Sequence, residues 1–240
     1  MRMRKHFATG AALAAAAAMA LTACGGGGGT TASGTGTGTE LNVAAAYTSD
    51  DFGPLTTGAL PMGTNWQVLE GLYRLDRTDY SVSPALAAGD PVMVSDTEYE
   101  IALRDGAKFS DGTDVTAEDV VAAFGKATAE GSIFGQFFTF IDSMEAKDTT
   151  TVTVYLKHPF ASLKERLAIL MVTPASADAA AMKSNPIGSG PYKYTEVGEQ
   201  KVVAVPNEYY NGNAPATVDT INWLPLKDDT PRLSAAYDGT

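Results

Sequence analysis

The segment LRDGAKFSDG, residues 103–112, is the part of this sequence that says most about its fold. Asp105-Gly106 suits the two-residue turn of a β-hairpin. Asp111-Gly112 carries the same turn chemistry, since aspartate bonds to nearby backbone and glycine accepts unusual dihedral angles. We therefore predict a return strand at Lys108-Phe109, between the two turns.

A helix is predicted directly after these turns, where VTAEDV occupies residues 115–120. Thr116 can cap the first turn. Glu118 and Asp119 would lie in that turn, where the helix dipole favours acidic side chains. The apolar stripe that follows is formed by Val120, Val121, Phe124 and Ala127. This pattern predicts an amphipathic helix.

Strands and helices are interspersed on both sides of this stretch. Residues 98–103 alternate apolar and polar side chains, which is the period of a half-buried strand. The other predicted strands are residues 41–46, 151–156, 201–205 and 218–224. The other predicted helices are residues 65–73, 163–172 and 178–183. This order favours a mixed α/β or α+β domain over a doubly wound Rossmann sheet.

Three segments together carry a resemblance to a known family. The first is VLEGLY at residues 68–73, followed by SPALA at residues 83–87. The second is the opening stretch, and the third is NPIGSGPY at residues 185–192, followed by NEYY at residues 207–210. Their order and spacing resemble the family 5 solute-binding proteins, the extracellular receptors of peptide and nickel ABC importers. The resemblance runs from Leu41 to Asp238, with Ser110 where the family often has histidine.

The resemblance implies a fold like that of type II periplasmic binding proteins, with ligand held between two lobes. Members of the family are usually about twice as long as this chain. Residues 40–240 therefore look like the N-terminal lobe, with a mixed sheet and hairpins, truncated at the crossover to an absent second lobe. A genuine single-lobe relative is the alternative, and we favour the truncated form. The motifs themselves also have local roles as turns, a helix start and a stiff loop, so we expect them to hold the fold rather than touch ligand.

The beginning of the chain indicates export and a lipid anchor. Three basic residues, Arg2, Arg4 and Lys5, are followed by an apolar run at residues 11–21. This run is too short for a permanent transmembrane helix, which needs about 20 residues. The sequence LTAC at residues 21–24 looks like a lipobox, which implies that Cys24 is lipidated after removal of residues 1–23. Residues 24–39, rich in Gly and Thr, would be a flexible tether. The expected location is the outer face of the cytoplasmic membrane; the alternative is a plain signal peptide with a chance cysteine.

Composition narrows the classes of function. Removing residues 1–23 lowers Lys+Arg from 17 to 14 while Asp+Glu stays at 28, so the formal charge falls from −11 to −14. A protein with this much negative charge repels nucleic acid, and we therefore expect no nucleic-acid partner. Cys24 is the only cysteine, and His158 is the only histidine outside the leader. We therefore expect no metal site, no cofactor and no catalytic residues, and a hydrolase is the weakest interpretation.

Candidate ligand-binding residues follow the first predicted strand, because strand-end loops are where α/β folds place ligands. They are Tyr47, Thr48, Ser49 and Asp50. Asn65 and Trp66 are added because a helix predicted to start there would offer free backbone N–H groups to an anion. A core position for Trp66 and a solvated loop position for Asp50 are the alternatives.

These observations predict a substrate-binding lipoprotein of an ABC importer that captures a small solute without chemistry. Its expected partners are an oligopeptide or similar solute and the permease subunits. Peptide, nickel chelate and oligosaccharide all remain open as ligands. The alternative function is a single-lobe cell-surface interaction protein with no role in transport.

Overall fold

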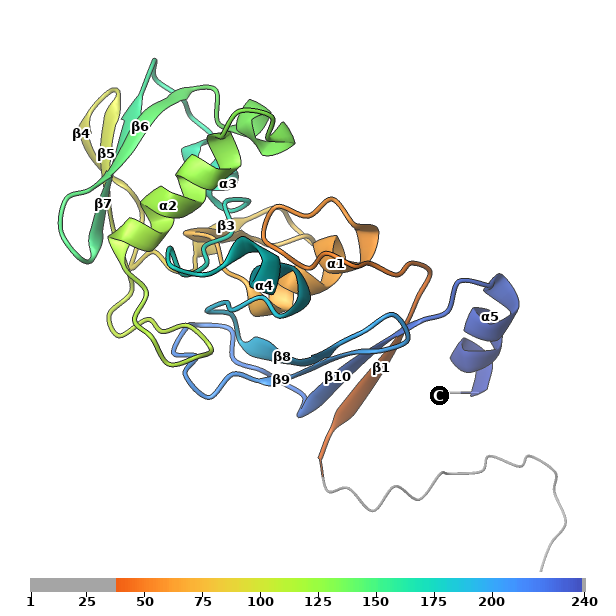
Figure 1. The fold of residues 1–240 in the computed structure, drawn as a ribbon. Coiled ribbons are helices and arrows are strands. Elements are labelled where there is room, and N and C mark those ends of the chain that lie inside the picture. Colours follow the sequence, from red (N-terminus) through yellow and green to blue (C-terminus); the bar gives the residue numbers. More distant parts are fainter. Residues whose placement is uncertain (1–37, 239–240) are drawn as a thin grey trace, which may run out of the picture. The chain divides into compact units, whose positions relative to one another are not determined.

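The computed structural model describes residues 38–238 (Figure 1). The predicted signal peptide, the lipidation at Cys24 and all but the end of the predicted tether lie outside these residues. The described residues fall within one compact unit, Thr37–Thr240. Within it, the strands form two four-stranded sheets and one two-stranded sheet.

The first sheet brings together strands from both ends of the described chain (Figure 1). Its order is β1 (Glu40–Ala45), β10 (Thr220–Pro225), β9 (Val202–Pro206) and β8 (Tyr192–Val197). β1 runs parallel to β10, with Leu41 opposite Ile221, and the other pairs are antiparallel. Helix α1 (Ala59–Val68) packs against this sheet, and Phe52, Val68 and Trp223 belong to the shared core. A mixed sheet of this kind confirms the predicted mixed α/β class.

The second four-stranded sheet is antiparallel throughout. Its order is β4 (Val92–Ser95), β5 (Glu98–Ala102), β7 (Thr151–Leu156) and β6 (Ile141–Ala146). Helix α2 (Ala117–Thr128) packs on β6 and β7, and Val120, Val152 and Val154 are fully buried between them. The predicted amphipathic helix is confirmed, with its capping box formed by Thr116 and Asp119.

Smaller elements join the two sheets. They are the hairpin of β2 (Tyr73–Leu75) and β3 (Val82–Pro84), the 3-10 helix η1 (Ile133–Phe137), and the helices α3 (Leu163–Leu167), α4 (Ala179–Ser184) and α5 (Asp229–Asp238). The strands predicted at 41–46, 98–103, 151–156, 201–205 and 218–224 all occur within two residues of their predicted bounds. β2, β3, β4, β6, β8 and α5 were not predicted.

The predicted hairpin around Asp105-Gly106 is wrong. β5 pairs with β4 and β7, and Lys108 makes only an isolated bridge with Asp114. The turns themselves are present, because Gly106 and Gly112 have φ values of 64° and 87°. The chain instead folds back around the second turn, with Phe109 N–H donating to Thr113 O at 2.9 Å. The two turns therefore close a small loop over the buried Phe109 ring, which local turn chemistry alone does not distinguish from a hairpin.

Two predicted helices have other bounds. α1 starts at Ala59 and ends at Val68, instead of running from 65 to 73, and α3 ends at Leu167 instead of 172. The segments after these two helices leave the helical path because they contact each other. Glu70 and Val172 form an antiparallel bridge, with Val172 N–H donating to Glu70 O at 2.9 Å. Pairing between distant segments thus overrides the apolar periodicity.

Candidate functional site

The parallel pairing of β1 and β10 places the carboxyl ends of both strands at one edge of the first sheet. Leu226 N–H donates to Ala45 O at 2.7 Å and holds the two ends together. A hollow of about 420 Å³ opens there. Its lining residues are Thr48, Glu199, Gln200, Pro225, Leu226 and Lys227. Such a crevice beyond the ends of parallel strands is where open α/β sheets bind ligands.

The loop after β1 presents some of its side chains outward and anchors others. The Tyr47 side chain is 61% exposed, and Asp50 is also exposed. Ser49 Oγ instead donates to Asp51 O at 3.0 Å and accepts from Asp51 N–H at 3.2 Å. Phe52 is fully buried against Tyr194, with ring centroids 5.7 Å apart. The loop is therefore pinned at its far end. Of the candidate residues in it, Thr48 lines the hollow, and Tyr47 and Asp50 are exposed on either side of it along the chain.

Asn65 lies inside the fold. Its side chain is 5% exposed, and its amide nitrogen donates to the carbonyls of Phe52 and Gly53. Its amide oxygen accepts from the Tyr194 hydroxyl at 2.9 Å. These bonds tie α1 to the loop after β1 and to β8. Asn65 therefore supports the predicted loop residues from behind, through its buried amide.

Trp66 lines a separate groove of about 590 Å³ at the C-terminal end of α1. The argument that placed it with Asn65 at a helix start is wrong, because both residues lie in the last part of α1 and the free N–H groups are at Ala59. The indole is half-buried, and the Arg77 guanidinium carbon lies 5.0 Å from its ring centroid. Trp66 and Thr48 thus line different hollows, which share no residue.

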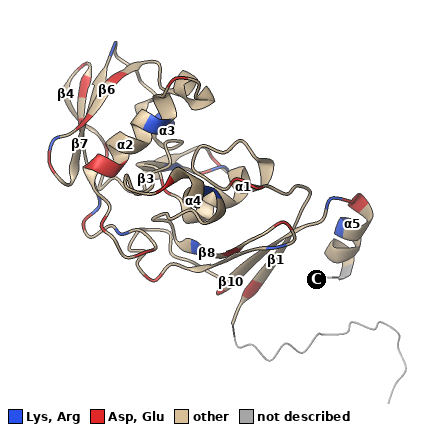
Figure 2. Cartoon of the chain, in the orientation of Figure 1, with Lys and Arg blue, Asp and Glu red and all other residues tan. Residues whose placement is uncertain are grey.

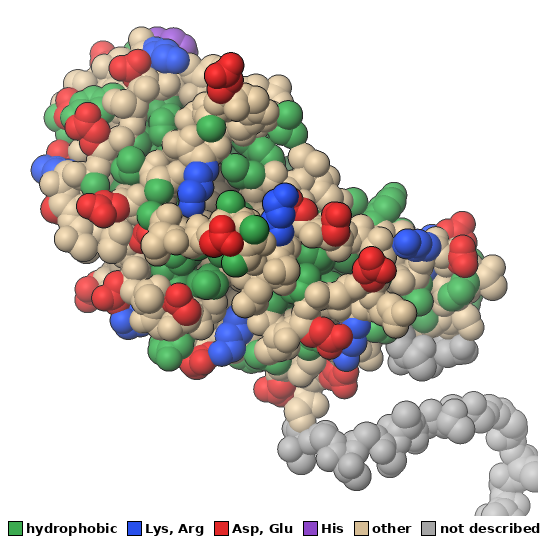
Figure 3. Space-filling view, viewed as in Figure 1, with side chains coloured by type: hydrophobic (Ala, Val, Ile, Leu, Met, Phe, Trp, Pro, Cys, Tyr) green, Lys and Arg blue, Asp and Glu red, His purple; other side chains and the backbone are tan. Residues whose placement is uncertain are grey.

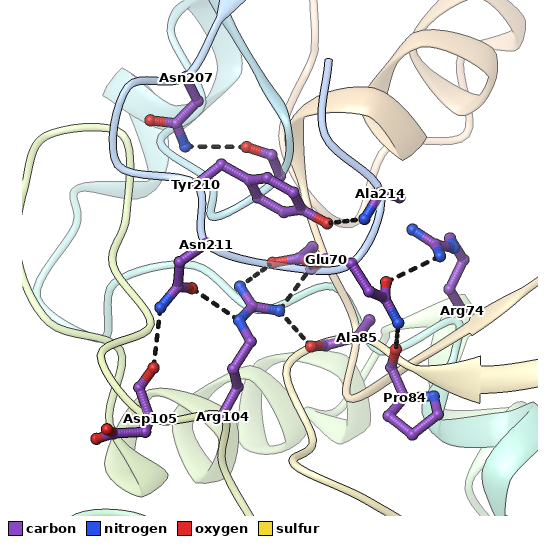
Figure 4. A network of polar contacts seen from close by, with 12 residues as sticks. Glu70, Arg74, Pro84, Ala85, Arg104, Asp105, Asn207, Tyr210, Asn211 and Ala214 are labelled. Atoms are coloured by element: carbon purple, nitrogen blue, oxygen red, sulfur yellow. Dashed lines mark hydrogen bonds and ion pairs between the residues drawn. The ribbon is translucent and has the colours of Figure 1, made fainter. Parts of the chain in front are cut away.

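The three sequence motifs converge on a buried ion pair between Glu70 and Arg104 (Figure 4). The Arg104 guanidinium lies 3.1 Å from Glu70 Oε2 and also donates to Ala85 O and, at 2.8 Å, to Asn211 Oδ1. The ring of Tyr210 lies 5.4 Å from the guanidinium carbon. Arg104, from the second motif, therefore bonds Glu70 and Ala85 of the first motif and Asn211, which follows the third.

Glycines of the third motif fit against the end of α1. A Cβ atom on Gly188 would lie 2.1 Å from Val68 O, and one on Gly190 would lie 2.7 Å from it. Gly190 N–H donates to Val68 O at 2.9 Å. Asn207 Nδ2 then holds Gly190 O at 2.9 Å. These contacts support the expectation that the motifs hold the fold.

Burial dominates the ionisation of Glu70. Desolvation raises the pKa of this carboxyl above its ordinary value, and the charge and hydrogen bonds of Arg104 offset only part of that increase. The nearby hydroxyl of Ser189 lowers this pKa to a smaller extent. This hydroxyl is fully buried and makes no hydrogen bond within the described residues. Because the Arg104 guanidinium also bonds Asn211 and Ala85, the Glu70–Arg104 pair fits a structural role at the place where the three motifs meet.

Two further observations bear on chemistry. Within residues 38–238, no group of three His, Cys, Asp or Glu side chains is arranged as metal ligands would be. No helix in this part of the chain is both long and apolar enough to cross a bilayer. Acidic and basic residues are dispersed over the elements (Figure 2), and hydrophobic side chains are visible at the surface between charged ones (Figure 3).

Sequence reasoning missed the partners of Thr48 in the hollow. Leu226 and Lys227 follow β10, whose strand pattern was recognised, but its parallel pairing with β1 was not. Glu199 and Gln200 lie in the β8–β9 turn, and β8 was not predicted. Leu226 and Lys227 could have been found from their position directly after the strand predicted at 218–224, whereas the sequence of β8, YKYTEV, has no apolar run that would mark Glu199 and Gln200.

Comparison with known proteins gives a family match. Residues 81–240, more than half of the chain, match the model of "Bacterial extracellular solute-binding proteins, family 5 Middle". The chain is 30% identical over 179 residues to the glutathione-binding protein GsiB of Escherichia coli (strain K12), which covers 71% of this chain and 35% of GsiB.

Solved structures show the same fold. The match to Listeria monocytogenes OppA bound to peptide has a TM-score of 0.77 at 22% identity and covers 85% of this chain and 46% of that one. The match to NikA from Staphylococcus aureus in complex with Ni(L-His)2 has a TM-score of 0.70 at 20% identity and covers 84% of this chain and 42% of that one. The chain thus spans about a third of its curated relative and less than half of these structures.

Proposed function

The chain belongs to family 5 of the bacterial extracellular solute-binding proteins, and from that membership we propose that it captures an oligopeptide or a similar small solute for an ABC importer. The observation that carries the proposal is the hollow at the carboxyl ends of β1 and β10, edged by the exposed loop after β1. Tyr47 offers an aromatic face and a hydroxyl, and Asp50 offers a carboxylate to a peptide amine.

Capture in this scheme needs no covalent step. Thr48, Tyr47 and Asp50 form part of one wall, and a second wall closes over the solute by hinge motion to exclude water. One wall alone leaves most of a ligand solvated, so this lobe would bind weakly. The closed form would then dock on the permease subunits.

A peptide panel tests the proposal. Tripeptides and nickel–histidine are titrated into the chain by isothermal calorimetry, together with the Tyr47→Ala and Asp50→Ala variants. Matched controls are Tyr80→Ala and Asp96→Ala, exposed residues in turns of the other two sheets. We expect binding that weakens about tenfold in the two site variants and stays unchanged in the controls. If neither Tyr47→Ala nor Asp50→Ala changes the affinity for the solute, this site is rejected.

A lipid anchor at Cys24 is the second part of the proposal. It rests on the lipobox-like LTAC sequence, and it would keep the receptor beside its permease on the outer face of the cytoplasmic membrane. In cells fed labelled palmitate, the wild-type chain should carry label and sediment with membranes. Cys24→Ala should lose the label and leave the membrane fraction. Equal labelling of both chains would contradict the anchor.

A further inference from the structure

Asn211 is the only asparagine in the sequence that is followed by glycine. It lies outside the helices and strands and is exposed. The backbone nitrogen of Gly212 has no neighbouring Cβ to shield it. An asparagine followed by such a nitrogen is prone to attack on its own side-chain carbonyl carbon. Asn211-Gly212 therefore combines a reactive pair of residues with an irregular, exposed segment.

The fold requires glycine at position 212. A Cβ atom there would overlap the hydroxyl oxygen of Tyr210. That hydroxyl accepts from Ala214 N–H at 3.2 Å, and the Tyr210 ring lies 5.4 Å from the Arg104 guanidinium carbon. The packing that holds Tyr210 beside Arg104 therefore also keeps the reactive pair of residues in the chain.

The side-chain amide of Asn211 contacts the buried ion pair (Figure 4). Arg104 Nε–H donates to Asn211 Oδ1 at 2.8 Å, and Asn211 Nδ2 donates to Asp105 O at 2.9 Å. Deamidation replaces Nδ2 with an oxygen, which has no hydrogen to donate to Asp105 O. The new negative charge would lie on the guanidinium that already pairs with Glu70. The product is therefore a second carboxylate that competes for Arg104.

We propose that Asn211-Gly212 is a site of spontaneous deamidation and that the product loosens the Glu70–Arg104 pair. In the first step, the Gly212 nitrogen bonds to Asn211 Cγ and the Cγ–Nδ2 bond breaks. The Gly212 amide proton leaves with Nδ2 as ammonia, and a succinimide ring remains. Water then opens this ring at either carbonyl, which gives aspartate or isoaspartate. Water is the only co-reactant that the sequence of steps consumes.

Asn213 provides a matched control two residues later. It is also exposed, and its Oδ1 accepts from the Arg74 guanidinium at 3.1 Å, while its Nδ2 donates to Pro84 O at 3.3 Å. An arginine and a backbone carbonyl thus hold the amides of Asn213 and Asn211 in the same way. The residue after Asn213 is Ala214, whose Cβ shields its backbone nitrogen. A difference in rate between the two asparagines therefore reports the effect of the residue that follows.

Ageing of the folded 240-residue chain at mildly alkaline pH tests the chemistry. Peptide mapping by mass spectrometry measures the conversion of amide to acid at each asparagine against an unaged sample, and isoaspartate methyltransferase labels the isoaspartate product. We expect Asn211 to convert at least about tenfold faster than Asn213. Asn211→Gln, which keeps an amide but would need a larger ring, should abolish the signal at this position. Equal conversion at Asn211 and Asn213, or an intact Asn211 after a capped peptide of residues 207–215 has converted, would overturn the proposal.

Asn211→Asp tests the consequence for the ion pair. In the wild-type background the added carboxylate competes with Glu70, so the urea midpoint should fall. In the Glu70→Gln background it becomes the counter-charge of Arg104, so the loss should be smaller. Asn213→Asp, which adds the same charge beside Arg74, should depend less on the background. Circular dichroism checks the fold of each variant, and if the double variant does not fold, aged wild-type chain separated by ion exchange still gives the midpoint of the deamidated form. A midpoint that does not fall in the wild-type background, or that falls equally in both, would overturn the loosening.

Discussion

Arg104 shows how a single side chain can join segments that are far apart in sequence. Its guanidinium pairs with Glu70, 34 positions earlier, and with Asn211, 107 positions later. The Arg104 side chain is 15% exposed and that of Glu70 is 6% exposed. Because the pair is largely removed from water, each partner depends on the other for compensation of its charge.

Arg104→Met should therefore be strongly destabilising. It leaves the Glu70 carboxylate buried without its partner, at a cost of about 3–5 kcal/mol near neutral pH. The double variant Glu70→Gln/Arg104→Met removes both charges and should recover part of that loss. Urea unfolding of the wild type, both single variants and the double variant measures the coupling. A double variant as unstable as the sum of both single variants would contradict it.

The Glu70 carboxyl also predicts a pH dependence. Its pKa is raised in the folded state because burial disfavours the charged form, so the folded chain binds this proton more tightly than the unfolded chain does. The resulting stabilisation is complete below the ordinary pKa of 4.5 and is lost as pH rises through the raised value. The unfolding free energy of wild type minus that of Glu70→Gln should therefore fall as the pH rises above 4.5. A difference that grows with pH would show that Arg104 outweighs desolvation.

At the scale of elements, α2 and α1 show when local signals suffice. Around α2, the capping residues and the apolar stripe indicate the same start and the same buried face. The Asp119 carboxylate accepts Thr116 N–H at 2.8 Å and Ala175 N–H at 2.7 Å, so the cap is also a tertiary contact. α1 has no side-chain hydrogen bond at its cap and includes Gly63, so its bounds had no comparable local signal.

The cap of α2 gives a graded prediction. Thr116→Ala should cost about 1 kcal/mol, which is typical for loss of a helix cap. Asp119→Ala should cost about 1–3 kcal/mol, because it also removes the acceptor of two partly buried hydrogen bonds, from the N–H groups of Thr116 and Ala175. Chemical unfolding of both variants measures the order, with Glu118→Ala, in the same turn but exposed, as the control. A Thr116→Ala variant that is less stable than Asp119→Ala would contradict this account.

At the scale of the whole molecule, the described residues have two hydrophobic cores. One lies between α2 and the second sheet, and the other lies between α1 and the first sheet. Gly188 and Gly190, packed against the end of α1, and the Glu70–Arg104 pair lie where the motif segments meet. This junction explains why the most recognisable sequence motifs do not line the hollow at Thr48.

Hydrogen exchange should reflect this layout. β7 lies between β5 and β6 in its sheet, and Val152 and Val154 are fully buried, so their amides should exchange among the slowest in the chain. Amides of α5 should exchange faster, since Leu233 and Tyr237 are 58% and 87% exposed and no α5 residue belongs to either core. Native-state exchange followed by mass spectrometry measures both. Protection of α5 equal to that of β7 would contradict the assignment.

The sequence by itself determined the mixed class, five of the ten strands, α2 with its cap, the turns at Gly106 and Gly112, and the resemblance to family 5. Each of these depends on neighbouring residues or on a motif that can be read along the chain. Only the tertiary structure decided where α1 ends, which strands pair with β5, and that β1 runs parallel to β10. It also separated Trp66 from Tyr47, Thr48 and Asp50. These features depend on contacts between segments up to 182 residues apart, such as Glu40 with Asn222, and neither local periodicity nor turn chemistry encodes such a pairing.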